Sequence, residues 1–205
     1  TAKYLGLPDE EKYKGLGVSA CATCDGFFYR KKNVAVIGGG DSACEEAVYL
    51  SRLAKKVYLI VRKPYLRASQ IMQQRVQNAP NIEILFNTNT KRLFGKTKLE
   101  GATLTSHKGT AEEKTYDICI DGFFLAIGHK PNSEIFKPWI STDPMGYIVT
   151  IGSATSTNIP GVFAAGDVAD PIYQQAINAA ASGCRAAIDA EKFINEKQSL
   201  KDNDN

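Results

Sequence analysis

Hydrophobic and polar positions take on a regular spacing at Asn33, where the first clearly ordered segment of the chain is predicted. A β-branched run at 34–37 precedes a glycine-rich turn, and apolar residues then recur at helical spacing, at Ala43, Ala47, Leu50 and Ala54. A second apolar run follows at 57–61. Strand, helix and strand in this order predict a right-handed βαβ unit.

The ordered pattern continues well beyond this unit. Three further kinds of segment are predicted: a helix whose apolar side holds Met72, Val76 and Ala79; strands at 82–86 and 118–127; and a small antiparallel excursion between Lys91 and Asp117. Strands that alternate with helices indicate an α/β fold built on a parallel sheet.

A second, shorter unit is predicted after the interruption at 128–131, where glycine and proline break the core pattern. Strands are expected near 147–150 and 162–165. A long helix is expected from about Tyr173, with an inner face formed by Ile177, Ala181, Cys184 and Ile188. From Asn195 onward the chain is polar and is expected to fray.

Composition narrows the class of protein. The 205 residues are 43% hydrophobic and 23% charged, which is typical of a soluble globular chain. No apolar run reaches the roughly 18 residues that span a bilayer, and no signal-like start is present, so we expect no membrane association and a cytoplasmic location. The net charge of +3 is spread among acidic residues, which argues against a nucleic-acid partner.

The turn after the first strand matches the dinucleotide fingerprint. Gly38, Gly40 and Ala43 follow a strand and open a helix, where glycines let the backbone approach a pyrophosphate. The alternative is a tight turn that binds nothing. Asp41 or Ser42 is expected to cap the helix.

Three cations follow the second strand, where an NAD site would place an acid. Arg62 and Lys63, with Arg67 close behind, suit the 2′-phosphate of NADP. An ordinary solvated basic loop is the alternative.

The five cysteines include one closely spaced pair, Cys21 and Cys24. This spacing suits either a redox disulfide or half of a zinc site, and the absence of a second spaced pair favours redox chemistry and no metal. Asp25 is either a proton carrier for the thiols or simply a turn residue before glycine. The remaining cysteines are expected to be buried thiols: Cys44, Cys119 and Cys184.

Several motifs together resemble one known family. The strings SACATCDG, AVIGGGDSACEEA, LIVRKPYLRAS, AIGHKPN and GVFAAGDVAD followed by IYQQAI are similar to the low-molecular-weight, NADPH-dependent thioredoxin reductases, and the match runs nearly end to end. The resemblance implies a Rossmann-like, three-layer NADPH-binding domain together with part of a second Rossmann-like domain that binds FAD. The implied segments are an end piece and hinge at 1–4, the NADPH domain at 5–127, the C-terminal part of the FAD domain at 128–194, and a polar tail at 195–205.

The same resemblance implies roles for individual residues. Cys21 and Cys24 would form the active disulfide, with Cys24 facing the flavin, Cys21 attacking the thioredoxin disulfide and Asp25 transferring a proton. NADPH would lie on the turn of Gly38, Gly40, Asp41, Ser42 and Ala43 and on the cluster of Arg62, Lys63 and Arg67. FAD would contact Asp167, Gln174, Gln175 and Ala176.

The implied reaction passes electrons from NADPH through FAD and the disulfide to thioredoxin, in a homodimer whose domains rotate about hinges near 1–7 and 128–131. The chain departs from the family pattern at two places: Val61-Arg62-Lys63 stands where His-Arg-Arg is usual, which keeps two cations, and Gln174 stands where arginine is usual. The family's GxGPAG loop for the ADP half of FAD has no counterpart here, so we expect this chain to be a piece of a longer reductase.

Two other functions remain open at this point. A flavoprotein partner of a peroxiredoxin shares the architecture but lacks the basic cluster after the second strand. A nucleotide-binding module without catalysis is the other, because the FAD loop is missing.

Overall fold

A computed structural model describes residues 1–152 and 155–203 of the chain, which forms two compact units. One unit comprises Ala2–His129, and the other comprises Thr1 with Lys130–Asn205. Both mix helices with irregular or extended segments, and the larger unit holds a parallel sheet, so the predicted α/β class is confirmed.

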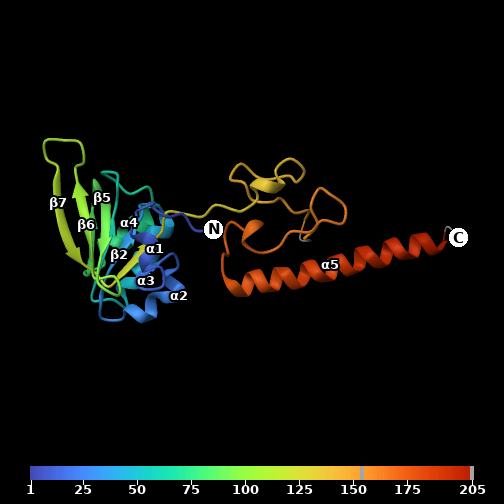
Figure 1. Cartoon of the computed structure of the whole chain (residues 1–205), viewed down its shortest axis with the longest axis horizontal. Coiled ribbons are helices and arrows are strands. Elements are labelled where there is room, and N and C mark those ends of the chain that lie inside the picture. The colour runs from blue at the N-terminus through green and yellow to red at the C-terminus, as the bar shows by residue number, and fades with distance from the viewer. Residues whose placement is uncertain (153–154, 204–205) are drawn as a thin grey trace. The chain divides into compact units, whose positions relative to one another are not determined.

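A five-stranded parallel sheet forms the centre of the larger unit (Figure 1). Its order is β1-β8-β2-β3-β4, where the strands are β1 (Val18–Ser19), β8 (Gly122–Leu125), β2 (Asn33–Ile37), β3 (Lys56–Ile60) and β4 (Ile82–Leu85). The helix α3 (Asp41–Ser51) connects β2 to β3, which confirms the predicted βαβ unit. All carboxyl ends of these strands lie at one edge of the sheet.

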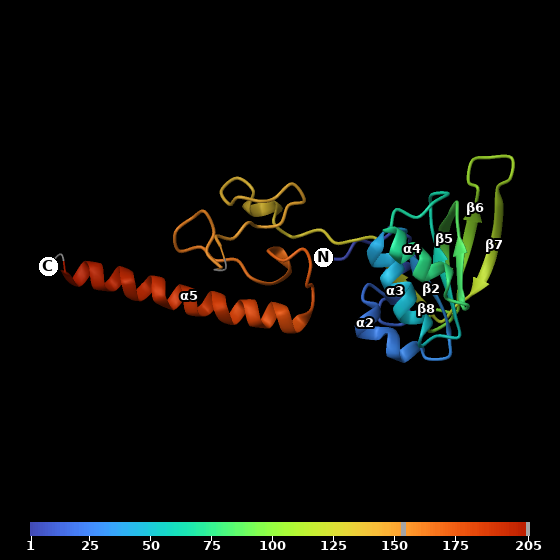
Figure 2. The ribbon, with the colours of Figure 1, turned by 180° about the vertical axis from the view of Figure 1, so that it is seen from behind.

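Two layers cover the two faces of this sheet (Figures 1 and 2). Helices α3 and α4 (Gln70–Gln77) pack with Val34 and Val36 of β2, whereas Ala35 and Ile37, which point the other way, pack against the second sheet. That second sheet is antiparallel, in the order β5 (Thr88–Phe94), β6 (Gly101–Ser106), β7 (Lys114–Cys119). The predicted antiparallel excursion is therefore confirmed.

The predicted apolar side of α3 is the side that the structure buries. Ala43, Ala47 and Leu50 are fully inaccessible to solvent, and Ala54 is buried just beyond the helix end at Ser51. The predicted strand region at 118–127 is divided, because residues 118–119 end β7 and β8 begins only at Gly122.

The segment before the first long strand carries structure that no pattern predicted. It contains the short helices α1 (Glu10–Tyr13), α2 (Ala22–Asp25) and the 3₁₀ helix η1 (Gly26–Tyr29). The buried carboxylate of Glu10 accepts hydrogen bonds from the amides of Leu5, Gly6 and Leu7, which fixes the approach to α1.

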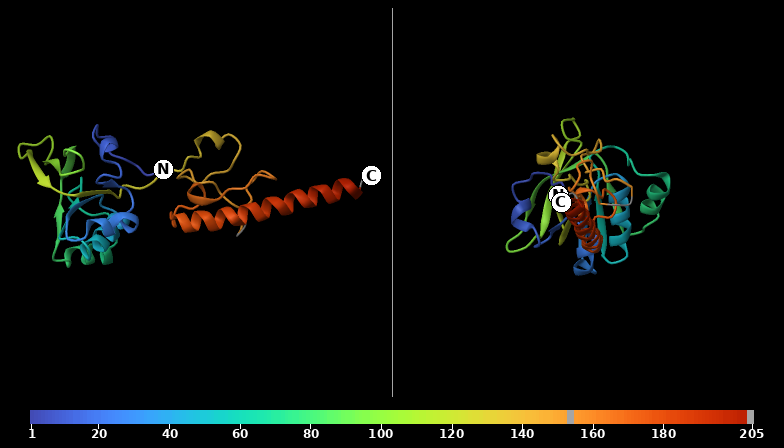
Figure 3. Two further views of the ribbon diagram at one scale, coloured as in Figure 1. Left: turned by 60° about the horizontal axis from the view of Figure 1, so that its bottom comes forward. Right: turned by 90° about the vertical axis from the view of Figure 1, so that its right-hand side faces the viewer.

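The smaller unit contains three helices among its described residues: η2 (Glu134–Phe136), η3 (Gly166–Val168) and α5 (Ala176–Asn203), the last a single uninterrupted helix (Figure 3). The strands predicted near 147–150 and 162–165 are reduced to isolated bridges between Thr142 and Ile148 and between Ser156 and Phe163. The prediction of a frayed segment from Asn195 is wrong as far as Asn203, because α5 continues to that residue.

The predicted inner face of α5 is wrong as well. Ile177 is 76% exposed, Ile188 is 47% exposed, and Ala181 and Cys184 are also exposed. The small core of this unit is formed instead by Ile140, Ile148 and Ala164. Periodicity marks an apolar stripe on a helix but does not determine what covers it.

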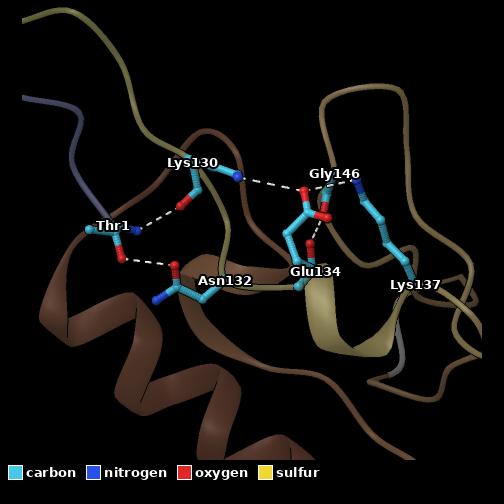
Figure 4. A network of polar contacts seen from close by, with 7 residues as sticks. Thr1, Lys130, Asn132, Glu134, Lys137 and Gly146 are labelled. Atoms are coloured by element: carbon cyan, nitrogen blue, oxygen red, sulfur yellow. Dashed lines mark hydrogen bonds and ion pairs between the residues drawn. The ribbon is translucent and has the colours of Figure 1, made fainter.

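A network of polar contacts joins residue 1 to the start of this smaller unit (Figure 4). The amine of Thr1 donates to the carbonyl of Lys130 at 2.8 Å, and its hydroxyl donates to Oδ1 of Asn132 at 2.9 Å. Nearby, a hydrogen bond from Lys137 and the charge of Lys130 lower the pKa of the Glu134 carboxyl. These contacts place both chain segments in one unit.

The three remaining cysteines differ in environment. Cys44 is buried on α3 as predicted, and burial raises the pKa of its thiol to about 11. Cys119 and Cys184 are exposed, contrary to the prediction. On the edge strand β7, Ile118 points inward, and the next residue, Cys119, therefore points outward.

Within the described residues, no helix combines the length and the apolar character needed to cross a bilayer.

The half-buried Glu46 on α3 should make stability depend on pH. Its Oε2 is buried without a hydrogen-bond partner in the described structure, and burial, with the charge of Glu45, raises its pKa from 4.5 to about 7. A raised carboxyl pKa destabilises the fold wherever the group is ionised, so the cost appears above pH 4.5 and is complete above about pH 7.

Glu46→Gln should therefore match the parent near pH 4.5 and be more stable by about 2–3 kcal/mol at pH 8. Urea unfolding at both pH values measures this difference. An equal stability of the two proteins at pH 8 would contradict it.

Candidate functional site

The paired cysteines form a disulfide at the start of α2. Cys21 follows β1 and is joined to Cys24, with 5.3 Å between their Cα atoms. Cys21 is the N-cap of α2, and its Sγ accepts a hydrogen bond from the amide of Cys24 at 3.2 Å. The hydroxyl of Ser19 accepts from the amide of Cys21 at 3.1 Å. The redox interpretation of the pair is thus supported by a formed bond.

The disulfide is accessible from solvent, although its helix is anchored in the core. Cys24 is exposed and Cys21 half-buried, whereas Ala22 between them is buried against the α3 side of the sheet. Asp25 ends α2 and is half-buried. Burial raises the pKa of Tyr29, and the neighbouring charge of Asp25 raises it further. The carboxylate therefore lies within electrostatic reach of that ring.

The glycine turn between β2 and α3 is closely packed at its first position and open at its third. Gly38 has φ +146°, and a Cβ there would lie 2.5 Å from the carbonyl oxygen of Ala126 and 2.8 Å from Cβ of Ala43. A Cβ on Gly40 would meet nothing within 4 Å. The turn therefore leaves space at the point where the fingerprint predicts a pyrophosphate.

Helix α3 presents its first amides toward this open space. Gly40 is the N-cap, and its carbonyl accepts from the amide of Cys44 at 3.1 Å. The first amides of a helix have no acceptor within it, which suits an anion. Asp41 and Ser42 are exposed, but neither is the N-cap, so the capping prediction is wrong. The extended backbone of Gly40 already opens the helix.

The cationic loop lies at the same edge of the sheet. Arg62, Lys63 and Arg67 are exposed after β3, and the amide of Arg67 donates to the carbonyl of Gly39 at 2.6 Å. None of the three side chains takes part in an ion pair within the described structure. The fold thus brings the predicted pyrophosphate turn and the predicted 2′-phosphate cluster together, with their charges available.

One contact of this region was not predicted from the sequence. Oδ1 of Asp41 accepts hydrogen bonds from the amide of Ser69 at 2.9 Å and from its hydroxyl at 2.8 Å. These bonds lower the pKa of Asp41. Because the residues are 28 positions apart, no local motif could have indicated the pair.

The residues predicted for FAD lie in the smaller unit. Asp167 is exposed on η3, and the amide of Gly166 beside it donates to the hydroxyl of Ser182 on α5 at 2.9 Å. Gln175 and Ala176 are exposed at the start of α5. The side chain of Gln174 donates to the hydroxyl of Tyr147 at 2.9 Å. Asp167 and the first turns of α5 are therefore neighbours.

No group of three or more His, Cys, Asp or Glu side chains in the described part of the chain could hold a metal ion.

Comparison with known proteins adds a consistent set of relatives. The model of the pyridine nucleotide-disulphide oxidoreductase family matches residues 1–183. Thioredoxin reductase of Coxiella burnetii is 50% identical over 202 residues, which cover 95% of this chain and 62% of the relative. Mitochondrial thioredoxin reductase of Kluyveromyces lactis is 52% identical over 198 residues, with 96% and 56% covered.

Solved structures agree with these relatives. Thioredoxin reductase from Giardia duodenalis has a TM-score of 0.83 at 38% identity, with 95% of this chain and 63% of that chain covered. The enzyme from Streptococcus pyogenes has a TM-score of 0.88 at 34% identity, with 96% and 63% covered. The chain spans about three fifths of the length of the relatives that it matches.

Two glycines of the turn should respond differently to the same substitution. Gly38→Ala should destabilise the protein by about 2 kcal/mol or more, because the new methyl collides with backbone at positive φ. Gly40→Ala should cost about 1 kcal/mol or less, because Gly40 is the N-cap of α3, where alanine is less favoured than glycine. It should nevertheless weaken NADP⁺ binding by about tenfold or more, because its methyl occupies the open space.

Urea unfolding and calorimetric titration with NADP⁺ measure both effects. If Gly40→Ala bound NADP⁺ as tightly as the parent, the turn would not be the pyrophosphate site.

Proposed function

The chain belongs to the pyridine nucleotide-disulphide oxidoreductase family, and on that premise we propose that the intact protein is an NADPH-dependent thioredoxin-disulfide reductase. The observation that carries the proposal is the placement of a solvent-accessible disulfide in the same compact unit as a dinucleotide turn and a free cationic loop. The proposed net reaction converts NADPH, a proton and a thioredoxin disulfide into NADP⁺ and a thioredoxin dithiol.

The glycine turn and the cationic loop are proposed to bind NADPH. The turn residues Gly38, Gly40, Asp41, Ser42 and Ala43 are proposed to form the pyrophosphate site, where the first amides of α3 would donate hydrogen bonds to the pyrophosphate. The buried Ala43 would act by packing. Arg62, Lys63 and Arg67 would pair with the 2′-phosphate, since they are exposed and carry no competing ion pair in the described structure.

The disulfide is proposed to receive two electrons and one proton, which leave one thiolate and one thiol. It then passes the electrons and that proton to thioredoxin, and the second proton of the thioredoxin dithiol comes from solvent. In the reduced pair, the amide of Cys24 that now donates to Sγ of Cys21 would stabilise a Cys21 thiolate. That thiolate would attack the thioredoxin disulfide and form a mixed disulfide. Cys24, after losing its proton, would then attack the sulfur of Cys21, which restores the Cys21–Cys24 bond and displaces a thioredoxin thiolate. Asp25, next to Cys24, is proposed to carry the proton that the thiols exchange.

The smaller unit fits a flavin. Asp167 offers an exposed carboxylate for the hydroxyls of a ribityl chain, and Gln174, Gln175 and Ala176 precede or open α5 next to it. Ile172, Tyr173 and Ile177 are strongly exposed in the same stretch and would suit contact with an apolar ring. FAD, when bound, would supply the hydride acceptor and the electron relay between NADPH and the disulfide.

Thioredoxin as the protein substrate, a homodimer and a cytoplasmic location complete the proposal. The names of the relatives, which are thioredoxin reductases, support thioredoxin as the substrate. As to location, the relative from Kluyveromyces lactis is named as mitochondrial. The cationic loop weighs against the peroxiredoxin-linked alternative, and the disulfide weighs against a module that only binds nucleotide.

Removal of either paired sulfur should abolish electron transfer. In the intact protein, Cys24→Ser should reduce thioredoxin at the uncatalysed background rate, because the disulfide can no longer form. Cys119→Ser, at an exposed cysteine on an edge strand, should keep the parent rate. NADPH oxidation in the presence of oxidised thioredoxin measures both, and full activity of Cys24→Ser would refute the mechanism.

The cationic loop should determine the choice of nucleotide. Arg62→Ala should raise KM for NADPH by about 10- to 100-fold through loss of a charged hydrogen bond, while KM for NADH stays constant. Lys96→Ala removes an equally exposed cation elsewhere and should change neither constant. Steady-state rates with both nucleotides provide the measurement, and an equal loss for NADPH and NADH would exclude a 2′-phosphate contact.

A further inference from the structure

The side-chain pair of Asp41 and Ser69 joins the two halves of the proposed nucleotide site. Asp41 is the first residue of α3, directly after the glycine turn, and Ser69 is the N-cap of α4, directly after the cationic loop. One carboxylate oxygen accepts from both the amide and the hydroxyl of Ser69, at 2.9 and 2.8 Å. We refer to these two bonds, with the bond from the Arg67 amide to the Gly39 carbonyl, as the clamp.

The rest of the cationic loop is anchored elsewhere. Leu66 and Ala68 are buried in the core on the helix side of the sheet. The side-chain amide of Gln73 donates to the carbonyl of Ala68 at 2.8 Å, which ties the loop to α4. The clamp, by contrast, ties the loop to the glycine turn and so controls the spacing between the two proposed phosphate sites.

The side chain of Ser69 makes no hydrogen bond other than the one to Asp41 in the described part of the structure. Its side chain does not cap α4, although serine at an N-cap position usually does so. The hydroxyl is used for Asp41 instead. Loss of this hydroxyl would therefore remove a contact of the clamp without removing a helix cap.

An acidic residue at this place needs an explanation. A carboxylate beside the proposed sites of two phosphates would repel both of them. The charge-assisted bonds from Ser69 direct Oδ1 toward α4 and offset part of its charge. A contribution of the clamp to nucleotide binding would explain why an aspartate is present at position 41, where repulsion of the phosphates alone would disfavour it.

We propose that Asp41 and Ser69 are positioning residues that strengthen the preference for NADPH over NADH by holding the cationic loop at a fixed spacing from the glycine turn. The inference rests on the proposed use of NADPH. It gives Asp41 a positioning role in the proposed NADPH site and adds Ser69 as a second positioning residue. In NADPH the adenosine ribose joins the pyrophosphate to the 2′-phosphate, so the two phosphate groups would need the glycine turn and the cationic loop at a matching spacing. NADH lacks the 2′-phosphate and would not depend on the loop.

Calorimetric titration of the intact, flavin-loaded protein with NADP⁺ and with NAD⁺ tests the proposal. Ser69→Ala should weaken NADP⁺ binding about threefold to tenfold and leave NAD⁺ within about twofold. Ser69→Thr, which keeps the hydroxyl, should stay close to the parent. Asp41→Ala combined with Ser69→Ala should lose no more than Asp41→Ala alone, because both remove the same contact.

A matched control separates the clamp from general stability. Ser51→Ala removes another hydroxyl bond of the same unit, from Ser51 to the carbonyl of Val48, at the opposite end of α3 from Asp41. It should leave both affinities unchanged. Thermal unfolding of each variant shows whether the fold is intact.

Three results would overturn the inference. Equal losses for NADP⁺ and NAD⁺ in Ser69→Ala and Asp41→Ala, or no loss of NADP⁺ binding in either variant, would mean that the contact has no role in discrimination. Tighter NADP⁺ binding by Asp41→Ala would mean that the carboxylate acts only by repulsion. A parent protein without preference for NADP⁺ would instead refute the proposed function itself, so the two failures are distinguishable.

Discussion

Close packing at the first glycine of the turn is the constraint on which the nucleotide-binding unit depends. Gly38 lies so near the carbonyl of Ala126 and the methyl of Ala43 that no side chain fits at this position. This close contact fixes the position of β2 relative to α3 and to the segment that follows β8. The turn can then present Gly40 and the first amides of α3 to an open space. Because β2 and β3 are parallel, the cationic loop emerges beside it.

The disulfide depends on the same packing from another side. Ala22, between the paired cysteines, is buried with Ala43 and Ala47 of α3, so α2 is held against the helix that begins at the glycine turn. One helix therefore supports both the proposed dinucleotide site and the redox pair. Both sites belong to one compact unit, while the residues proposed for the flavin belong to the other.

The sequence predicted the parts of the fold in which local pattern and burial agree. The apolar residues around Val36 have the spacing of a packed strand, and those around Ala47 have the spacing of a packed helix. The structure buries both sets as expected. The pattern failed in the smaller unit, where Ile177 and Cys184 repeat at helical spacing but remain exposed. Periodicity describes one element, and burial depends on a neighbour that the pattern does not contain.

The candidate site, like the fold, was predicted only in part from the sequence. The glycines and paired cysteines have spacings with a direct physical meaning, so their turn and their bond followed from the sequence. Asp41 was expected to cap its own helix, yet its carboxylate binds Ser69, because a contact across 28 residues depends on the tertiary fold. The most direct test of the account is anaerobic NADPH addition to the intact, flavin-loaded protein, followed by thiol alkylation and mass spectrometry. The account predicts new labelling at Cys21 and Cys24 with no change at Cys44, Cys119 or Cys184. An oxidised Cys21–Cys24 pair after NADPH has been consumed would contradict it.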